Sequence, residues 1–207
     1  LMEVRMKKIL MLALLSAVLC TGLLFAAGSE EVAVKEATTL KLAWEPETGP
    51  FTYPWWTTGG VNRILYKRLL NSDENLDPVY PSMAEKWSIS DDGMDISITL
   101  RDDMKWHDGA PITIEDVVWS IETSLLGSRI HSTFKNAFGS IEGAAEYKEG
   151  TADSVSGLKV SGNTLTIKMA NPSAFIDKAI GQFAPLPKHL LENEDPATLQ
   201  LAEHWEW

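Results

Sequence analysis

The sequence predicts a mixed α/β or α+β fold, in which strands and helices alternate along the chain. Three observations support this fold class. Apolar residues alternate with polar ones in several short runs, they recur at helical spacing in others, and local hairpins are joined by Asp-Gly and Gly-Asn turns. Hydrophobic residues make up 44% of the 207-residue chain and charged residues 23%, which is the composition of a globular protein rather than of a disordered one.

The first 27 residues have the pattern of a secretory signal peptide. Residues 6–8 give a basic start, residues 9–27 follow without a charge, and the chain becomes polar after Gly28. We therefore expect cleavage near Ala27 or Gly28 and a periplasmic or extracytoplasmic location. The alternative is a retained membrane anchor, because this uncharged run is nearly long enough to span a bilayer.

Cys20, the only cysteine of the chain, lies inside this apolar run. Leu19 precedes it and more apolar residues follow, whereas a bacterial lipoprotein needs a small residue before the lipidated cysteine and polar sequence soon after it. The sequence therefore disfavours a lipid anchor at Cys20. If residues 1–27 are removed, the remaining chain has no cysteine for a disulfide or for thiolate chemistry.

The chain is acidic. Its formal charge is −11, and because residues 1–27 carry three basic and one acidic side chain, residues 28–207 have a formal charge of −13. This balance repels phosphate backbones and argues against nucleic acid as a partner.

The elements of the N-terminal half follow from the spacing of apolar residues. Residues 39–44, T-L-K-L-A-W, alternate as a half-buried strand, and a loop rich in Pro, Gly and aromatic residues follows at 45–60. Residues 61–70 then place apolar side chains at helical spacing. Strands at 87–90 and 95–101 are joined by an Asp-Gly turn. Apolar and polar residues alternate along the second strand, so we expect one of its faces to be exposed to solvent.

The C-terminal half begins with a second predicted hairpin. Its strands lie within residues 157–169, and the chain turns at Gly162-Asn163. A helix is expected from about Ser173, and Pro185 and Pro187 end the regular pattern.

Residues 101–121, R-D-D-M-K-W-H-D-G-A-P-I-T-I-E-D-V-V-W-S-I, place titratable side chains close together, as an active site would. Each acid also has a structural explanation. Asp108-Gly109 is a turn dipeptide, and Thr113 with Asp116 resembles a capping box at the start of an amphipathic helix. A single histidine, His107, beside one aspartate is not a catalytic constellation without a third group. We therefore interpret this stretch as a turn and a helix start.

The rest of the chain offers no motif for chemistry. The four histidines, at 107, 131, 189 and 204, lack paired metal-ligand spacing, and there is no G-x-S-x-G, G-x-G-x-x-G or P-loop sequence. We expect no catalytic residue, no metal ion and no cofactor. An enzyme whose carboxylates come from distant segments, such as a secreted hydrolase without a recognisable motif, stays open as an alternative.

Residues 81–122 resemble the signature region of the family 5 extracellular solute-binding proteins, the peptide, dipeptide and nickel receptors of bacterial ABC importers. That family shows P-x-L-A-x-x-W, an S-x-D-G hairpin, L-R-x-x-V-K-W-H-D-G and T-x-E-D-V, and here Met83 and Met104 replace a Leu and a Val of the pattern. The positions that match are Pro81, Ala84, Trp87, Ser90, Asp92, Gly93, Leu100, Arg101, Lys105, Trp106, His107, Asp108, Gly109, Thr113, Glu115, Asp116 and Val117.

The resemblance implies the first lobe of a type II periplasmic binding protein, at 28–207, with residues 57–154 as an inserted subdomain and the second lobe missing. It implies a monomeric receptor that traps a peptide or similar small solute between two lobes and delivers it to an ABC permease. Nickel chelates, opines and oligosaccharides are bound by the same scaffold. Because family members are longer, we expect an N-terminal fragment or a truncated reading frame, and a sensory, chaperone-like or non-functional chain is the remaining alternative.

Loops at the carboxyl ends of strands line the crevice of open α/β sheets, which makes the loop after the first predicted strand the candidate ligand-facing segment. Aromatic faces in this loop could pack against a ligand while hydroxyl and indole N–H groups make directional bonds. The alternative is that at least two of the aromatic residues are buried in the lobe. The candidate ligand-binding residues are Trp44, Glu45, Phe51, Thr52, Tyr53, Trp55 and Trp56.

Overall fold

The computed structural model describes residues 55, 62–75 and 77–201. They all belong to one of the two compact units of the chain, Trp44–Trp207. The predicted signal peptide, Cys20, the strand expected at 39–44 and every candidate ligand-binding residue except Trp55 lie outside the described residues.

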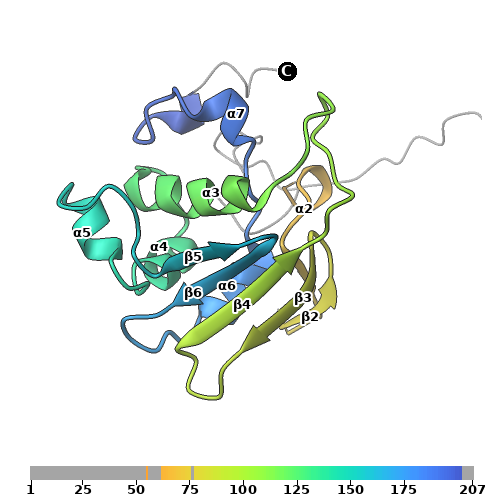
Figure 1. Ribbon diagram of the computed structural model, residues 1–207, viewed down its shortest axis with the longest axis horizontal. Helices are drawn as coiled ribbons and strands as arrows, with labels where there is room; N and C mark the ends of the chain where they lie inside the picture. The colour runs from red at the N-terminus through yellow and green to blue at the C-terminus, as the bar shows by residue number, and fades with distance from the viewer. Residues whose placement is uncertain (1–54, 56–61, 76, 202–207) are drawn as a thin grey trace, which may run out of the picture. The chain divides into compact units, whose positions relative to one another are not determined.

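Runs of strands and runs of helices follow one another along the described chain (Figure 1), which confirms the predicted mixed fold class. In chain order the elements are α2 (Asn62–Leu65), β1 (Leu70–Ser72), β2 (Pro78–Pro81), β3 (Ala84–Ile89), β4 (Asp95–Leu100), α3 (Ile114–Leu126), α4 (Ser132–Phe138), α5 (Ala144–Lys148), β5 (Leu158–Ser161), β6 (Thr164–Lys168), α6 (Ile176–Gln182), α7 (Lys188–Leu191) and a 3₁₀ helix (Leu199–Leu201).

Four of these strands form an antiparallel sheet in the order β3-β4-β6-β5. Both predicted hairpins are confirmed, with Gly93 (φ 68°) in the β3–β4 turn and Gly162 (φ 57°) in the β5–β6 turn, where a left-handed backbone favours glycine. The expected alternation along β4 is also confirmed, because Ile96, Ile98 and Leu100 are buried while the residues between them are partly exposed.

The helix expected over residues 61–70 is much shorter in the structure. Only α2 is helical, and Leu70 instead begins β1, which pairs with β2. The backbone of Leu69 is bonded to distant partners, since its N–H donates to the Phe183 carbonyl and its own carbonyl accepts from Ala84. Periodicity does not distinguish a helix from a strand in so short an apolar run, and these tertiary bonds hold Leu69 outside the helix, in a bend directly before β1.

The helix expected after the W-H-D-G turn is α3. Its first turn has the predicted capping box, since the Asp116 carboxylate accepts from the N–H of the N-cap residue Thr113 at 2.8 Å. Val117 and Ile121 are fully buried on the apolar face of this helix. Figure 1 shows α3 between the four-stranded sheet and α7, and it contacts both β6 and α7.

The helix expected from about Ser173 is α6, which ends before the two prolines as predicted. The four-stranded sheet extends past residue 154, because β6 pairs with β4 along its length. An inserted subdomain that contains β4 would therefore also contain β5 and β6. In the described part of the chain, no helix is both long enough and apolar enough to cross a membrane.

Candidate functional site

The carboxylate of Asp116 links two segments of the signature region to the start of α7. It is almost fully buried, with 4% of its surface exposed. Its Oδ2 accepts from the Thr113 N–H, from the Thr113 hydroxyl at 3.2 Å and from the Trp106 indole at 3.3 Å, and its Oδ1 accepts from the Lys188 N–H at 3.0 Å. Asp116 therefore fixes the turn before α3, the start of α3 and the start of α7 relative to one another.

A second contact joins the same turn to α7 at the surface. Nε2 of His189 lies 2.6 Å from Oδ2 of Asp108, and both side chains are about 40% exposed (38% and 42%). This contact, followed by the hydrogen bond from the Ala110 N–H, lowers the pKa of Asp108 below its usual value. His107, the histidine that the sequence places beside Asp108, is exposed.

The contacts described for this pair include no nucleophile. Within the described residues, neither Asp108 nor His189 accepts from or donates to a serine, threonine or tyrosine hydroxyl. No group of three or more His, Cys, Asp or Glu side chains in the same part of the chain could hold a metal ion. The described part of the signature region thus holds backbone segments together, as its turn and capping signals predict.

The segment 183–187, between α6 and α7, is a buried extended stretch whose backbone is bonded by distant groups. The Phe183 carbonyl accepts from the Leu69 N–H at 3.0 Å, and the Leu186 N–H donates to the Ser120 hydroxyl at 2.9 Å. The Ala184 carbonyl accepts from the Trp55 indole at 2.9 Å. These bonds satisfy polar groups that would otherwise be costly to bury. The sequence indicates only the two prolines of this segment. It does not indicate the hydrogen-bond partners, because each lies more than 60 residues away from the segment.

Trp55 lies in the core, with no exposed surface. Its ring stacks on Phe183, with 5.4 Å between centroids and 14° between planes, and its carbonyl accepts from the His131 N–H at 2.8 Å. Phe134 and Phe138 of α4 pack edge-on against the same Phe183 ring, at 5.4 and 4.8 Å.

Of the two roles that the sequence left open for the aromatic residues of this loop, the structure thus gives Trp55 the buried one. A side chain without exposed surface cannot touch a ligand in this conformation. The other six candidates, Trp44, Glu45, Phe51, Thr52, Tyr53 and Trp56, lie outside the described residues, so ligand contact stays a prediction for them.

One face of α3 forms the floor of a shallow hollow of about 150 Å³. Val118 and Trp119 of α3 are half-buried there, and Val160 of β5 is 45% exposed. Charged residues of both signs also line the hollow, namely Glu115 and Glu122 from α3 and Lys188 from α7.

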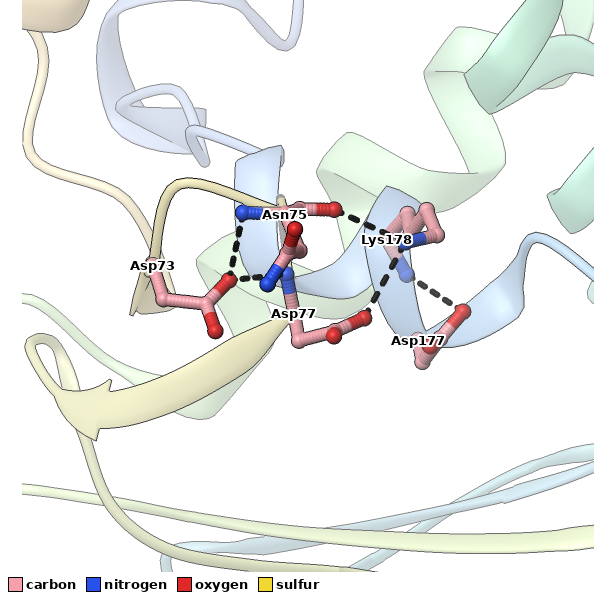
Figure 2. A network of polar contacts seen from close by, with 5 residues as sticks. All are labelled: Asp73, Asn75, Asp77, Asp177 and Lys178. Carbon is pink, nitrogen blue, oxygen red and sulfur yellow. Dashed lines mark hydrogen bonds and ion pairs between the residues drawn. The ribbon is translucent and has the colours of Figure 1, made fainter.

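A polar network joins the β1–β2 loop to α6 (Figure 2). Oδ1 of Asp73 accepts from the N–H groups of Asn75 and Asp77, which closes the loop, and the Lys178 ammonium donates to the Asn75 carbonyl at 3.1 Å and to Asp77 at 3.0 Å. The hydrogen bond to Asp77 raises the pKa of Lys178 above its usual value. The ammonium of Lys178 therefore forms an ion pair with Asp77 of this loop.

Comparison with known proteins gives consistent results. Residues 78–205 match the family model described as bacterial extracellular solute-binding proteins, family 5 middle. The periplasmic murein peptide-binding protein MppA of Escherichia coli is 31% identical over 136 residues, which cover 61% of this chain and 24% of that protein.

Two solved structures have the same fold over most of this chain. NikZ from Campylobacter jejuni in complex with Ni(L-His) has a TM-score of 0.54 and 26% identity, over 73% of this chain and 28% of NikZ. Listeria monocytogenes OppA bound to peptide has a TM-score of 0.56 and 25% identity, over 72% of this chain and 31% of OppA. The chain thus spans about a quarter to a third of the length of these relatives.

Proposed function

Because this chain belongs to the bacterial extracellular solute-binding proteins of family 5, we propose that it captures peptides or related small solutes outside the cytoplasmic membrane and delivers them to an ABC permease. The observation that carries this proposal is the family match over residues 78–205, more than half of the chain. The export signal predicted at residues 1–27 is an independent argument for the extracytoplasmic location.

A peptide is the first choice of ligand, because MppA is named as a murein peptide-binding protein and Listeria OppA was solved bound to a peptide. A nickel complex is the second, because NikZ was solved with Ni(L-His). In the proposed mechanism the ligand favours a closed form, since only there do two lobes touch it, and it thereby shifts the equilibrium from open to closed. Phe51, Thr52, Tyr53 and Trp56, with Trp44 and Glu45, are the proposed contacts from this lobe.

We propose that the protein is a monomeric receptor and not an enzyme. A secreted hydrolase would need a nucleophile or an activated water beside a general base. The Asp108–His189 pair does not favour that function, because it is exposed and bonds to no hydroxyl group in the described part of the chain.

Isothermal titration of the full-length protein with trialanine, pentaalanine and the Ni(L-His) complex tests this function. We expect binding of at least one of these probes, a change in intrinsic tryptophan fluorescence, and unchanged peptide when the same samples are analysed by mass spectrometry. Cleavage of the peptides would favour the hydrolase instead, and a full-length protein that neither binds nor cleaves any of the probes would contradict the receptor function.

A further inference from the structure

The side of α3 that lines the hollow is apolar in its centre and acidic at both ends. Val118 and Trp119 are half-buried there, and Glu115 and Glu122 lie about one turn before and after them. These four residues share one side of the helix, because positions three, four or seven residues apart return to the same face. The fully buried residues of α3, such as Val117, belong to the opposite side. The core therefore uses this side of α3 only in part.

The free edge of the four-stranded sheet borders the same hollow. β5 is the last strand in the order β3-β4-β6-β5, so no strand of the described chain pairs with its outer side. The Gly157 carbonyl accepts from the Lys168 N–H of the hairpin partner, whereas the Leu158 N–H points away from β6 and donates to the Val155 carbonyl. Because this direction alternates along an antiparallel strand, the N–H and carbonyl of Val160 also face the outer edge. The Val160 side chain, 45% exposed, lines the hollow.

The shape of this surface fits an extended chain with one apolar side chain. A strand that adds to the edge of β5 lies about 4.8 Å from it and can bond to the backbone of Val160. Its side chains alternate in direction, so one of them points toward Val118 and Trp119. The hollow of about 150 Å³ equals the volume of about five water molecules, which is enough for a single aliphatic side chain.

The charges around the hollow favour a basic segment. Within the described part of the chain, neither Glu115 nor Glu122 forms an ion pair, and Lys188 lies 3.9 Å from Glu192 instead. Oε1 of Glu122 accepts from the Val155 N–H, and its other oxygen has no such bond. The two acids are seven residues apart, which is about 10.5 Å along the helix axis. Side chains two residues before and after the apolar one share its face of an extended segment and are about 13 Å apart, a comparable span.

We propose that the hollow and the free edge of β5 dock an extended segment of a protein partner, in which a basic residue lies two positions to either side of an apolar one. The inference goes beyond the proposed function, because it uses none of the residues proposed to contact the solute. Main-chain bonds to the edge supply affinity in this mode of recognition, while the hollow and the two acids supply specificity. A second copy of this chain is a poorer occupant, since residues 28–207 have a formal charge of −13.

The first test uses the blocked peptide acetyl-Lys-Ser-Leu-Ser-Lys-amide, titrated into the full-length protein by isothermal calorimetry. We expect saturable binding that weakens at high salt, because exposed charges are screened there. The matched peptide acetyl-Glu-Ser-Leu-Ser-Glu-amide has the same apolar residue and reversed charges, and it is expected not to bind. Pentaalanine at high concentration is expected not to displace the lysine peptide, since the proposed solute contacts are different residues.

The second test changes the surface itself. Val160→Lys puts a like charge at the hollow and is expected to weaken binding of the lysine peptide at least about tenfold, and Glu115→Lys at least about threefold. Two variants outside the hollow are the controls. Val79→Lys changes a valine of β2 that is similarly exposed, at 43%, and Glu146→Lys changes an exposed acid in the first turn of α5. Both are expected to stay within about twofold of the parent, because their charge is remote and screened.

Four results would overturn the inference. They are a parent protein that does not bind the lysine peptide, a Val160→Lys variant that binds it as the parent does, control variants that lose as much affinity as the variants in the hollow, and displacement by pentaalanine, which would place the peptide in the solute site. None of these results bears on the proposed capture of solutes, which is tested with the solutes themselves.

Discussion

At the scale of single residues, Asp116 makes more backbone contacts than its place in a capping box requires. A capping carboxylate at this position ordinarily serves its own helix. Here the same carboxylate also accepts from the Trp106 indole and from the Lys188 N–H, which are 10 residues before it and 72 residues after it. A buried donor whose acceptor is removed loses the protein bond without regaining one to water, which makes such an acceptor costly to replace.

We expect Asp116→Ala to destabilise the protein by about 2–4 kcal/mol, because it leaves the N–H groups of Thr113 and Lys188 without their acceptor. Glu115→Gln is the control, since Glu115 is exposed in the same turn and contributes only the helix-dipole effect of about 0.3–1 kcal/mol. Urea denaturation followed by circular dichroism measures both. Equal losses in the two variants would mean that Asp116 acts only through its charge.

Asp92 gives a pH dependence that can be measured. Its carboxylate accepts from the Ser90 hydroxyl at 2.6 Å and from the Met94 N–H at 3.1 Å, and these bonds lower its pKa from the usual 3.8. Because the folded pKa is below the unfolded value, the stabilisation is present above about pH 4 and is lost as the pH falls through the folded value.

We therefore expect Asp92→Asn to lose less stability than the parent between about pH 4 and pH 2. Melting temperatures recorded across this range measure the difference. Asp91→Asn, one residue earlier in the same turn, is the control and should follow the parent. If Asp92→Asn has the same pH dependence of melting temperature as the parent, the charge of the Asp92 carboxylate does not contribute to the stability of the turn.

At the scale of elements, the segment 183–187 is neither helix nor strand, and yet it connects the α6–β1 side of the lobe to α3. Its bonds run to Leu69, to Trp55 and to Ser120 of α3, so that three separate parts of the chain are bonded to one stretch. The two prolines cannot donate a backbone hydrogen bond, which leaves fewer polar groups to satisfy in this buried position.

Substitution of two buried serines of α3 distinguishes how much the bond to this segment and a bond within the helix each contribute to stability. Ser120→Ala leaves the Leu186 N–H without a partner and is expected to cost about 1–3 kcal/mol. Ser124→Ala should cost less, because the Ser124 hydroxyl donates at 2.7 Å to the Ile121 carbonyl of its own helix. Thermal denaturation of both variants measures the difference, and a larger loss at Ser124 would contradict the connecting role of Ser120.

At the scale of the whole molecule, the fold is that of one lobe of a type II periplasmic binding protein. A ligand enclosed between two lobes gains contacts from both, and a ligand shifts a conformational equilibrium only by its difference in affinity for the two states. The polar network at Lys178, the segment 183–187 and the Asp116 carboxylate all act within this lobe.

A protein made of residues 28–207 is therefore expected to bind peptides at least about 100-fold more weakly than full-length Listeria OppA, since each factor of ten corresponds to about 1.4 kcal/mol of lost contact. Titration calorimetry of both proteins with the same peptide measures this ratio. Equal affinity would reject enclosure between two lobes as the source of binding energy.

The sequence alone was sufficient for the features that depend on neighbouring residues. The two hairpin turns, the alternation of β4, the start of α3 and the end of α6 were all predicted, because turn glycines, capping residues and apolar periodicity act over fewer than ten residues. The signature at residues 81–122 also identified the family from local pattern.

Only the tertiary structure decided the features that depend on partners far along the chain. Residues 69 and 70 have helical spacing, but bonds to Phe183 and Ala84 hold Leu69 in a bend before β1. The sequence left ligand contact and burial open for Trp55, and its burial in the structure depends on Phe183 and Ala184, which lie almost 130 residues away. The local spacing of apolar residues does not predict such long-range partners. They come together only when the apolar faces of distant elements pack into one core.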